Sequence, residues 1–371
     1  MQKSRSSRPW TRWLKLVFHL LVLTLVIWGI RHTIQKSLAE FRRQEFAWSE
    51  VHYAWLLGTG LCYLLGTLPA WWLWHRVLWA MGQQPRAWTS FRAYTIGHLG
   101  KYVPGKAMVV VLRAALVMGP QVDKAIAAAA VFVETLTVIA VSAMLAGILL
   151  IWHSLSGTAA HQIELPGGRH PHFLLFLASG LVVCTGIPSL PPVFRRVILL
   201  LRVDRASPQI APALQQLKLP LMASGWITNA AGCFLYGLSL WCTLRALPAG
   251  MITSSTDSLA QIQQVAETSR AVAADTLSWQ ALPQILPMIT AGLVLAVVAG
   301  FVSLIPGGAG VREMVMIAVL APQFGELAAV LSALLLRLVW LLTELFICPI
   351  LYAIRPRTPP LDAGPAPETA S

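Results

Sequence analysis

The feature that most constrains this chain is an interruption between two apolar stretches, residues 283–305 and 311–322. The interrupting segment and the charged dipeptide after it contain Pro306, Gly307, Gly308, Gly310, Arg312 and Glu313. Proline and glycine end helices, and irregular backbone or charge is tolerated at membrane depth only where protein or a water-filled cavity surrounds it. We therefore expect this break to line a cavity inside a membrane protein.

A similar break lies about two hundred residues earlier. It holds Lys101, Pro104, Gly105 and Lys106, and Arg113 follows it. The flanking apolar runs, residues 87–99 and 107–118, are each about a dozen residues long. At about 1.5 Å per residue such a helix is shorter than the roughly 30 Å of a hydrocarbon core. We interpret the two runs as half-helices of a re-entrant hairpin with Pro104 and Gly105 at its tip.

Composition assigns the chain to the polytopic, all-α membrane class. Of its 371 residues, 56% are hydrophobic and only 12% are charged. The net charge of +13 comes from lysines and arginines in short segments between apolar runs, the pattern of the positive-inside rule. A polyanion-binding protein would instead carry a basic patch interleaved with aromatic residues, so we expect no nucleic-acid partner.

The apolar runs predict six full spans and two hairpins. The spans are residues 16–30, 51–74, 125–151, 173–190, 220–244 and 326–354, with both termini cytoplasmic. Tryptophans 71, 72 and 74 would mark a headgroup belt at the end of the second span. One membrane domain, residues 1–355, would contain two halves of opposite orientation, residues 14–151 and 173–354, followed by a disordered tail, residues 356–371. Alternatively, residues 283–305 cross the membrane outright, which would undo this symmetry.

The charges near the breaks are candidate ligands for an anion. Each second half-helix would direct its N-terminus, with unpaired N–H groups and a positive dipole, into the protein. Lys101, Lys106 and Arg113 accompany the first such end, and Arg312 and Arg337 accompany the second. Backbone N–H groups with guanidinium groups are a common phosphate site. The alternative for the two lysines is that they extend to the headgroups.

Two glutamates lie within expected spans, Glu134 and Glu344. An ionisable side chain there is a functional candidate. Glu134 and Arg337 stand at matching distances from the two Pro-Gly breaks, so we expect them to pair. The pair would serve either the substrate or only the packing of the bundle. Proton coupling through Glu134 or Glu344 is a further hypothesis.

Catalytic and metal-binding motifs give no support for an enzyme. The run Gly100 to Lys106 resembles a phosphate-binding loop, but Ala107 stands where a magnesium-binding Ser or Thr is needed. The five cysteines are scattered in apolar runs without metal-ligand spacing. We expect no catalytic residue, no cofactor and no metal.

The two breaks resemble the signature regions of the lysylphosphatidylglycerol synthase transmembrane family, also called the flippase-like domain family. The matching residues are Lys101, Pro104, Gly105, Pro306, Gly307, Gly308, Gly310, Arg312 and Glu313, with Arg337 as a looser match. The resemblance covers most of residues 14–354. It departs at Thr135, where members often have an arginine. Bifunctional members append a soluble aminoacyltransferase domain, whereas about sixteen residues follow Arg355 here, so we expect the membrane half alone.

The resemblance implies a transporter in a bacterial plasma membrane that moves or binds an anionic or polyprenyl-phosphate-linked lipid between leaflets. The substrate-binding candidates are Lys101, Lys106, Arg113, Glu134, Arg312, Glu313, Arg337 and Glu344. Two alternatives stay open: a membrane-embedded transferase that uses lipid carriers, and a non-catalytic scaffold for lipid-synthesis enzymes, which would then be its partners.

Overall fold

The computed structural model describes residues 48–103, 107–119, 122–155, 209–248, 277–303 and 310–354, with Gly308 and a few single residues elsewhere. Across these ranges the regular structure is helical. The elements are η1 (Trp48–Glu50), α2 (Tyr53–Ala80), α3 (Ala87–His98), η2 (Leu99–Tyr102), α4 (Ala107–Leu116), α5 (Lys124–Leu155), α8 (Ile210–Gln215), α9 (Leu219–Ala246), α11 (Leu282–Val302), α12 (Val311–Phe324) and α13 (Glu326–Ala353).

Five of the described helices, α2, α5, α9, α11 and α13, are long and apolar enough to cross a membrane. This agrees with the multi-pass, all-helical class that composition predicts. Four of them, α2, α5, α9 and α13, correspond to expected spans. The other two expected spans, residues 16–30 and 173–190, lie wholly or almost wholly outside the described residues, as do the tail and the Pro104 and Pro306 turns.

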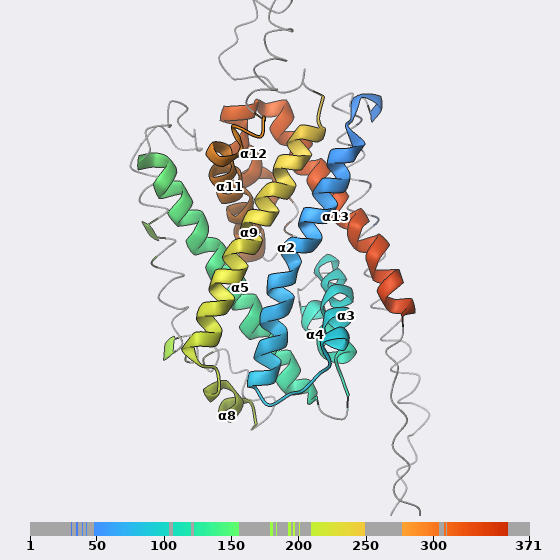
Figure 1. The fold of residues 1–371 in the computed structure, drawn as a ribbon, viewed down its shortest axis with the longest axis vertical. Helices are drawn as coiled ribbons and strands as arrows, with labels where there is room; N and C mark the ends of the chain where they lie inside the picture. The colour runs from blue at the N-terminus through green and yellow to red at the C-terminus, as the bar shows by residue number, and fades with distance from the viewer. Residues whose placement is uncertain are drawn as a thin grey trace, which may run out of the picture.

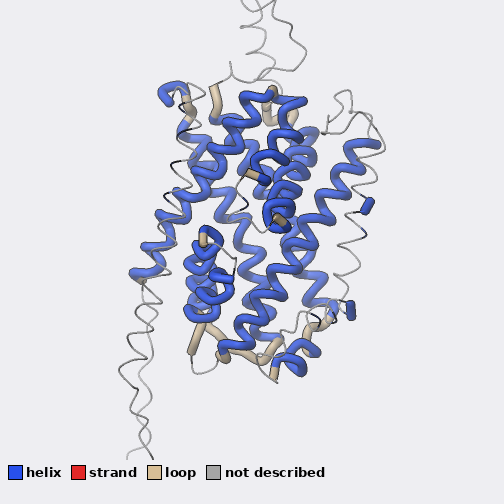
Figure 2. Tube along the Cα trace, turned by 180° about the vertical axis from the view of Figure 1, so that it is seen from behind, coloured by secondary structure: helices blue, strands red, loops and turns tan. Residues whose placement is uncertain are grey.

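Two pairs of helices that are adjacent in the sequence occupy opposite ends of the bundle (Figure 1). Helices α3 and α4 lie side by side in the lower half of the view, and α11 and α12 pack together in the upper half. The view from behind shows the same separation (Figure 2). The N-terminal ends of α4 and α12, which follow the two breaks, both face the middle of the bundle.

Each helix pair has its own hydrophobic core. One core packs α3, α4 and the first half of α5 against the second half of α2, and includes Trp74 and Leu73. The other packs α11, α12 and α13 against the end of α9, and includes Trp241 and Phe324. Helices α2 and α9 run along both cores and contact each other closely, with Gly66 lying against Tyr236. Small residues allow this approach, as between other membrane helices.

One expectation about a helix end is wrong, and one alternative stays open. Helix α2 does not end at the tryptophan cluster but continues to Ala80, and Trp74 is fully buried in a core. A tryptophan among apolar residues in a sequence looks the same whether it packs inward or anchors at a headgroup. Helix α11 has 21 residues, so at about 1.5 Å per residue it is long enough to cross a membrane by itself.

Candidate functional site

Charged side chains from six helical elements gather where the two helix pairs meet. We call this group the central charged cluster and define it as His98, Lys101, Arg113, Glu134, Arg312, Glu313, Arg337 and Glu344. Residue 98 ends α3, residue 101 lies in η2, residue 113 in α4 and residue 134 in α5, while α12 and α13 supply the rest. Seven of the eight, all except His98, are candidates from the two breaks or the intramembrane acids, so these charged candidates lie in one group.

The arginine after each break crosses a glycine of the preceding helix. A Cβ added at Gly97 of α3 would lie 2.5 Å from Cγ of Arg113, and one added at Gly300 of α11 would lie 2.3 Å from Cγ of Arg312. Real Cβ atoms do not approach other carbons so closely. Glycine is therefore required at both crossings, and it lets the stem of each arginine run over the neighbouring backbone toward the cluster.

Lys101 and Glu344 join the first helix pair to α13. The Lys101 ammonium lies 2.5 Å from Oε1 of Glu344, and the Tyr63 hydroxyl of α2 donates to the same oxygen. Glu344 is only 2% exposed, and its Oε2 has no hydrogen-bond partner among the residues that the structure describes. Such an oxygen is costly to bury, because a buried carboxylate needs hydrogen bonds to both oxygens to offset its lost hydration.

Arg113 and Glu134 form the most deeply buried ion pair of the described residues. The guanidinium lies 2.8 Å from Oε2 of Glu134, and both side chains are under 5% exposed. Tyr94 donates to the other oxygen of Glu134 over 3.1 Å, and the Arg113 guanidinium lies 3.8 Å from the centre of its ring. The pair is thus enclosed by a hydrogen bond and a cation–π contact.

His98 connects the two ion pairs. Its Nδ1 lies 3.2 Å from an Arg113 nitrogen, which can only donate, so Nδ1 accepts. In a neutral imidazole the proton is then on Nε2, which faces Oε1 of Glu344 at 3.9 Å. The histidine therefore links the α4–α5 pair to the η2–α13 pair.

Glu313 begins α12 and holds Arg337 of α13. Gly310 precedes the helix with φ +90°, a conformation that favours glycine, and its N–H donates to Oε2 of Glu313 over 2.6 Å. A glutamate in the first turn also complements the helix dipole. The other oxygen, Oε1, accepts from Arg337. Both carboxylate oxygens are thus engaged, one by the helix start and one by the guanidinium.

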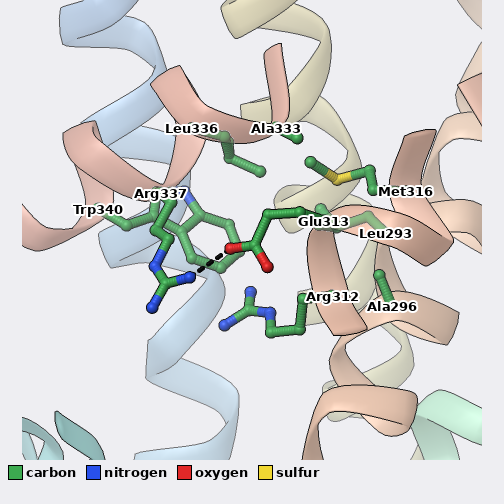
Figure 3. Close-up of a pocket in the computed structure, with 9 residues that line it drawn as sticks. All are labelled: Leu293, Ala296, Arg312, Glu313, Met316, Ala333, Leu336, Arg337 and Trp340. Atoms are coloured by element: carbon green, nitrogen blue, oxygen red, sulfur yellow. Dashed lines mark hydrogen bonds and ion pairs between the residues drawn. The ribbon is translucent and has the colours of Figure 1, made fainter. Parts of the chain in front are cut away.

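Arg312 lacks such a partner. No carboxylate of the described residues lies within ion-pairing distance of its guanidinium, which is 5.6 Å from the ring centre of Trp340. Arg312, Glu313 and Arg337 line one small cavity with Leu293, Ala296, Met316, Ala333, Leu336 and Trp340. Figure 3 shows the guanidinium groups of Arg312 and Arg337 near the Glu313 carboxylate, with the ion pair to Arg337 drawn as a dashed line. The volume of about 20 Å³ has room for a water molecule.

The expected pair of Glu134 with Arg337 is wrong. Glu134 pairs with Arg113, and Arg337 pairs with Glu313. In each case the partner lies on the helix that follows the break, α4 or α12, 21 residues before Glu134 and 24 residues before Arg337. The signs of the charges are exchanged: α4 supplies the cation and α5 the acid, whereas α12 supplies the acid and α13 the cation. Glu134 and Arg337 therefore pair with residues of the neighbouring helix and not with each other.

Some candidates lie outside the described residues, namely Pro104, Gly105, Lys106, Pro306 and Gly307. Other contributors were not predicted. Tyr63, Tyr94, His98 and Trp340 are in no motif, and only their polar or aromatic character within apolar runs distinguishes them. Trp340 stacks on Tyr63 with ring centres 4.5 Å apart and so joins the Lys101 side of the cluster to the Arg312 side.

The cluster has more cations than carboxylates. Its described members include four basic groups, Lys101, Arg113, Arg312 and Arg337, and three acids. Three of the cations are matched one to one, which leaves Arg312. A positive group without a counter-ion inside a helical bundle is an attractive site for a negatively charged ligand.

Comparison with known proteins adds no relative: no protein-family model matches the chain, and no curated protein does.

Proposed function

We propose that this chain binds an anionic membrane lipid at the central charged cluster and moves it between leaflets, as its resemblance to the flippase-like domain family implies. The observation that supports this best is Arg312, a half-buried cation that lines a cavity in the interior and has no carboxylate partner among the described residues. A lipid phosphate would supply the missing negative charge through charge-assisted hydrogen bonds.

In this proposal the two helix pairs are re-entrant hairpins that enter from opposite faces of the membrane. Three features support it: the short lengths of α3 and α4, the location of the pairs in opposite halves, and the arginine-over-glycine crossing in each. Such an inverted arrangement is common in transporters, where the binding site lies near the midplane. The apolar tails would stay in the bilayer while the head group crosses beside the cluster.

The cavity is small for a phosphate group, so the pair of Glu313 and Arg337 has to separate when a head group enters. This ion pair is more exposed than the Arg113–Glu134 pair, with side chains 17% and 16% exposed. An ion pair of partly exposed groups is weaker than its Coulomb energy suggests, because water screens it. Opening at α12 and α13 therefore costs less than opening at α4 and α5.

The test is lipid movement in liposomes containing the purified chain and fluorescent phosphatidylglycerol, read by chemical quenching of the outer leaflet. We expect Arg312→Gln to slow movement about tenfold or more, the loss of one charged hydrogen-bonding group. Arg76→Gln, at an exposed arginine of α2, is the matched control. Equal rates for all three proteins would reject the role of Arg312. No movement by the parent protein would favour the scaffold alternative.

A further inference from the structure

Three charged side chains of the described residues line the cavity, and their net charge is +1. Arg312 and Glu313 are consecutive residues at the start of α12, and Arg337 faces them from α13. The six other lining residues are uncharged, five of them aliphatic and one tryptophan. Such a wall screens charge poorly, so the net charge of the three groups and the ligand together is energetically important.

Glu313 already occupies the position of an anion at this site. Its Oε2 accepts a hydrogen bond from the N–H of Gly310 at the helix start, and its Oε1 accepts one from the Arg337 guanidinium. These donors, a helix N-terminal N–H and a guanidinium, are the groups that hold phosphate oxygens in many proteins. The carboxylate thereby neutralises one of the two arginines and leaves the other, Arg312, for a ligand.

We propose that Glu313 is a specificity-determining residue that limits the ligand to a head group with one negative charge, the charge of a phosphodiester. This inference rests on the proposed function. With a phosphodiester bound, the three lining charges and the ligand sum to zero. A phosphomonoester or diphosphate brings a further negative charge that faces Glu313 inside an apolar wall. Specificity of this kind comes from repulsion of the wrong ligand more than from attraction of the right one.

The same matching of charge is found elsewhere in the cluster. Lys101 and Arg113 each have a carboxylate within 2.8 Å, Glu344 and Glu134 respectively. Neither Lys101 nor Arg113 is therefore available to offset a second negative charge on the ligand unless its ion pair breaks. Breaking a buried pair is costly because it leaves an uncompensated charge.

The experiment measures the retention of two lipids by the full-length chain in detergent, by native mass spectrometry. The lipids are phosphatidylglycerol, a phosphodiester, and phosphatidic acid, a phosphomonoester, at an alkaline pH of about 9 where the phosphomonoester carries its second negative charge. We expect the parent protein to retain phosphatidylglycerol in preference. We expect Glu313→Gln, which keeps the size and the acceptor oxygen, to shift the ratio toward phosphatidic acid by about tenfold, as removal of a close like charge does.

A double variant separates charge from structure. Glu313→Gln with Arg337→Gln restores a net charge of +1 to the lining residues, so we expect it to return the ratio toward that of the parent. Loss of folding alone would not produce this recovery. Glu326→Gln, at an exposed carboxylate of α13, is the matched control and leaves the ratio unchanged. Inorganic phosphate is added as a competitor, and full displacement of the lipid by it would identify free phosphate as the ligand and overturn the lipid assignment.

The outcomes distinguish this inference from the proposed function. If the parent retains neither lipid, the proposed function fails. If it retains both equally and Glu313→Gln leaves their ratio unchanged, the proposed function stands and the role of Glu313 is rejected.

Discussion

The Arg113–Glu134 pair illustrates what a single charge does in this interior. Each partner is nearly inaccessible to solvent, and within the described part of the chain Arg113 Nε has no hydrogen-bond partner even with Glu134 present. Replacing such a pair by apolar groups is often neutral, whereas removal of one partner strands a charge. The pair is therefore better tested by comparing single and double changes than by a single change.

We predict that Glu134→Leu lowers the free energy of unfolding by about 3–5 kcal/mol, because it leaves the Arg113 guanidinium buried without a counter-ion. The double variant Arg113→Met with Glu134→Leu should recover most of this loss. Reversible unfolding in mixed detergent micelles, followed by circular dichroism, measures both. If the double variant is as unstable as the single one, the cost lies in packing around Tyr94 and not in the stranded charge.

At the residue scale, sequence predicts which groups are charged in the interior but not how they pair. Seven members of the cluster are predicted because they are charged side chains within apolar sequence, and all seven are among the described residues. They are Lys101, Arg113, Glu134, Arg312, Glu313, Arg337 and Glu344. The sequence does not predict which of these side chains form ion pairs with each other, because the pairing depends on how α4 and α12 pack against the next helix. His98 shows a second limit: a histidine at the end of a short helix gives no sign that it will link two ion pairs.

At the element scale, the first helix pair depends on a close approach of backbones. A Cβ at Gly100 of η2 would lie 2.6 Å from the backbone nitrogen of Val109 and 2.8 Å from the carbonyl carbon of Met108 in α4. Backbone atoms cannot move aside as a flexible side chain can. Added atoms at such a contact force the two elements apart.

We predict that Gly100→Ala destabilises the protein by about 1–3 kcal/mol, the usual cost of overpacking. It should also slow lipid movement, because displacement of η2 draws Lys101 away from Glu344. Gly119→Ala is the control, since a Cβ there meets nothing within 4 Å. The midpoint of thermal unfolding and the liposome assay report the two effects. A stable Gly100→Ala protein with the parent's lipid movement would contradict the close approach.

Helix positions are the part of this fold that sequence predicts well. The short helices expected at residues 87–99 and 107–118 are found at Ala87–His98 and Ala107–Leu116, because proline and glycine end them and length limits them. Helix α2 ends six residues beyond its expected end, since tryptophan suits both a core and a headgroup belt. The role of α11 is not determined by its sequence, because 21 apolar residues suit a full span as well as half of a deep hairpin.

For the whole molecule, charge predicts how the bundle is oriented. The lower end in Figure 1, where α2 ends and α5 and α9 begin, has Arg86, Lys124 and Lys218. The opposite end has Glu326 at the start of α13. Basic residues accumulate on the cytoplasmic side, so we expect the end with Arg86 to be cytoplasmic.

This orientation and the hairpin proposal share one test, the labelling of single cysteines by a membrane-impermeant maleimide in a variant without its five native cysteines. We predict that Gln84→Cys, in the exposed loop after α2, reacts only in inside-out vesicles, and that Trp279→Cys, 62% exposed before α11, reacts only in right-side-out vesicles.

Val302→Cys decides the role of α11. Its side chain is 69% exposed at the inner end of that helix. In a re-entrant hairpin this position lies at the depth of the acyl chains and reacts from neither side. If it reacts from the same side as Gln84→Cys, α11 crosses the membrane and the symmetry of two opposed hairpins is rejected.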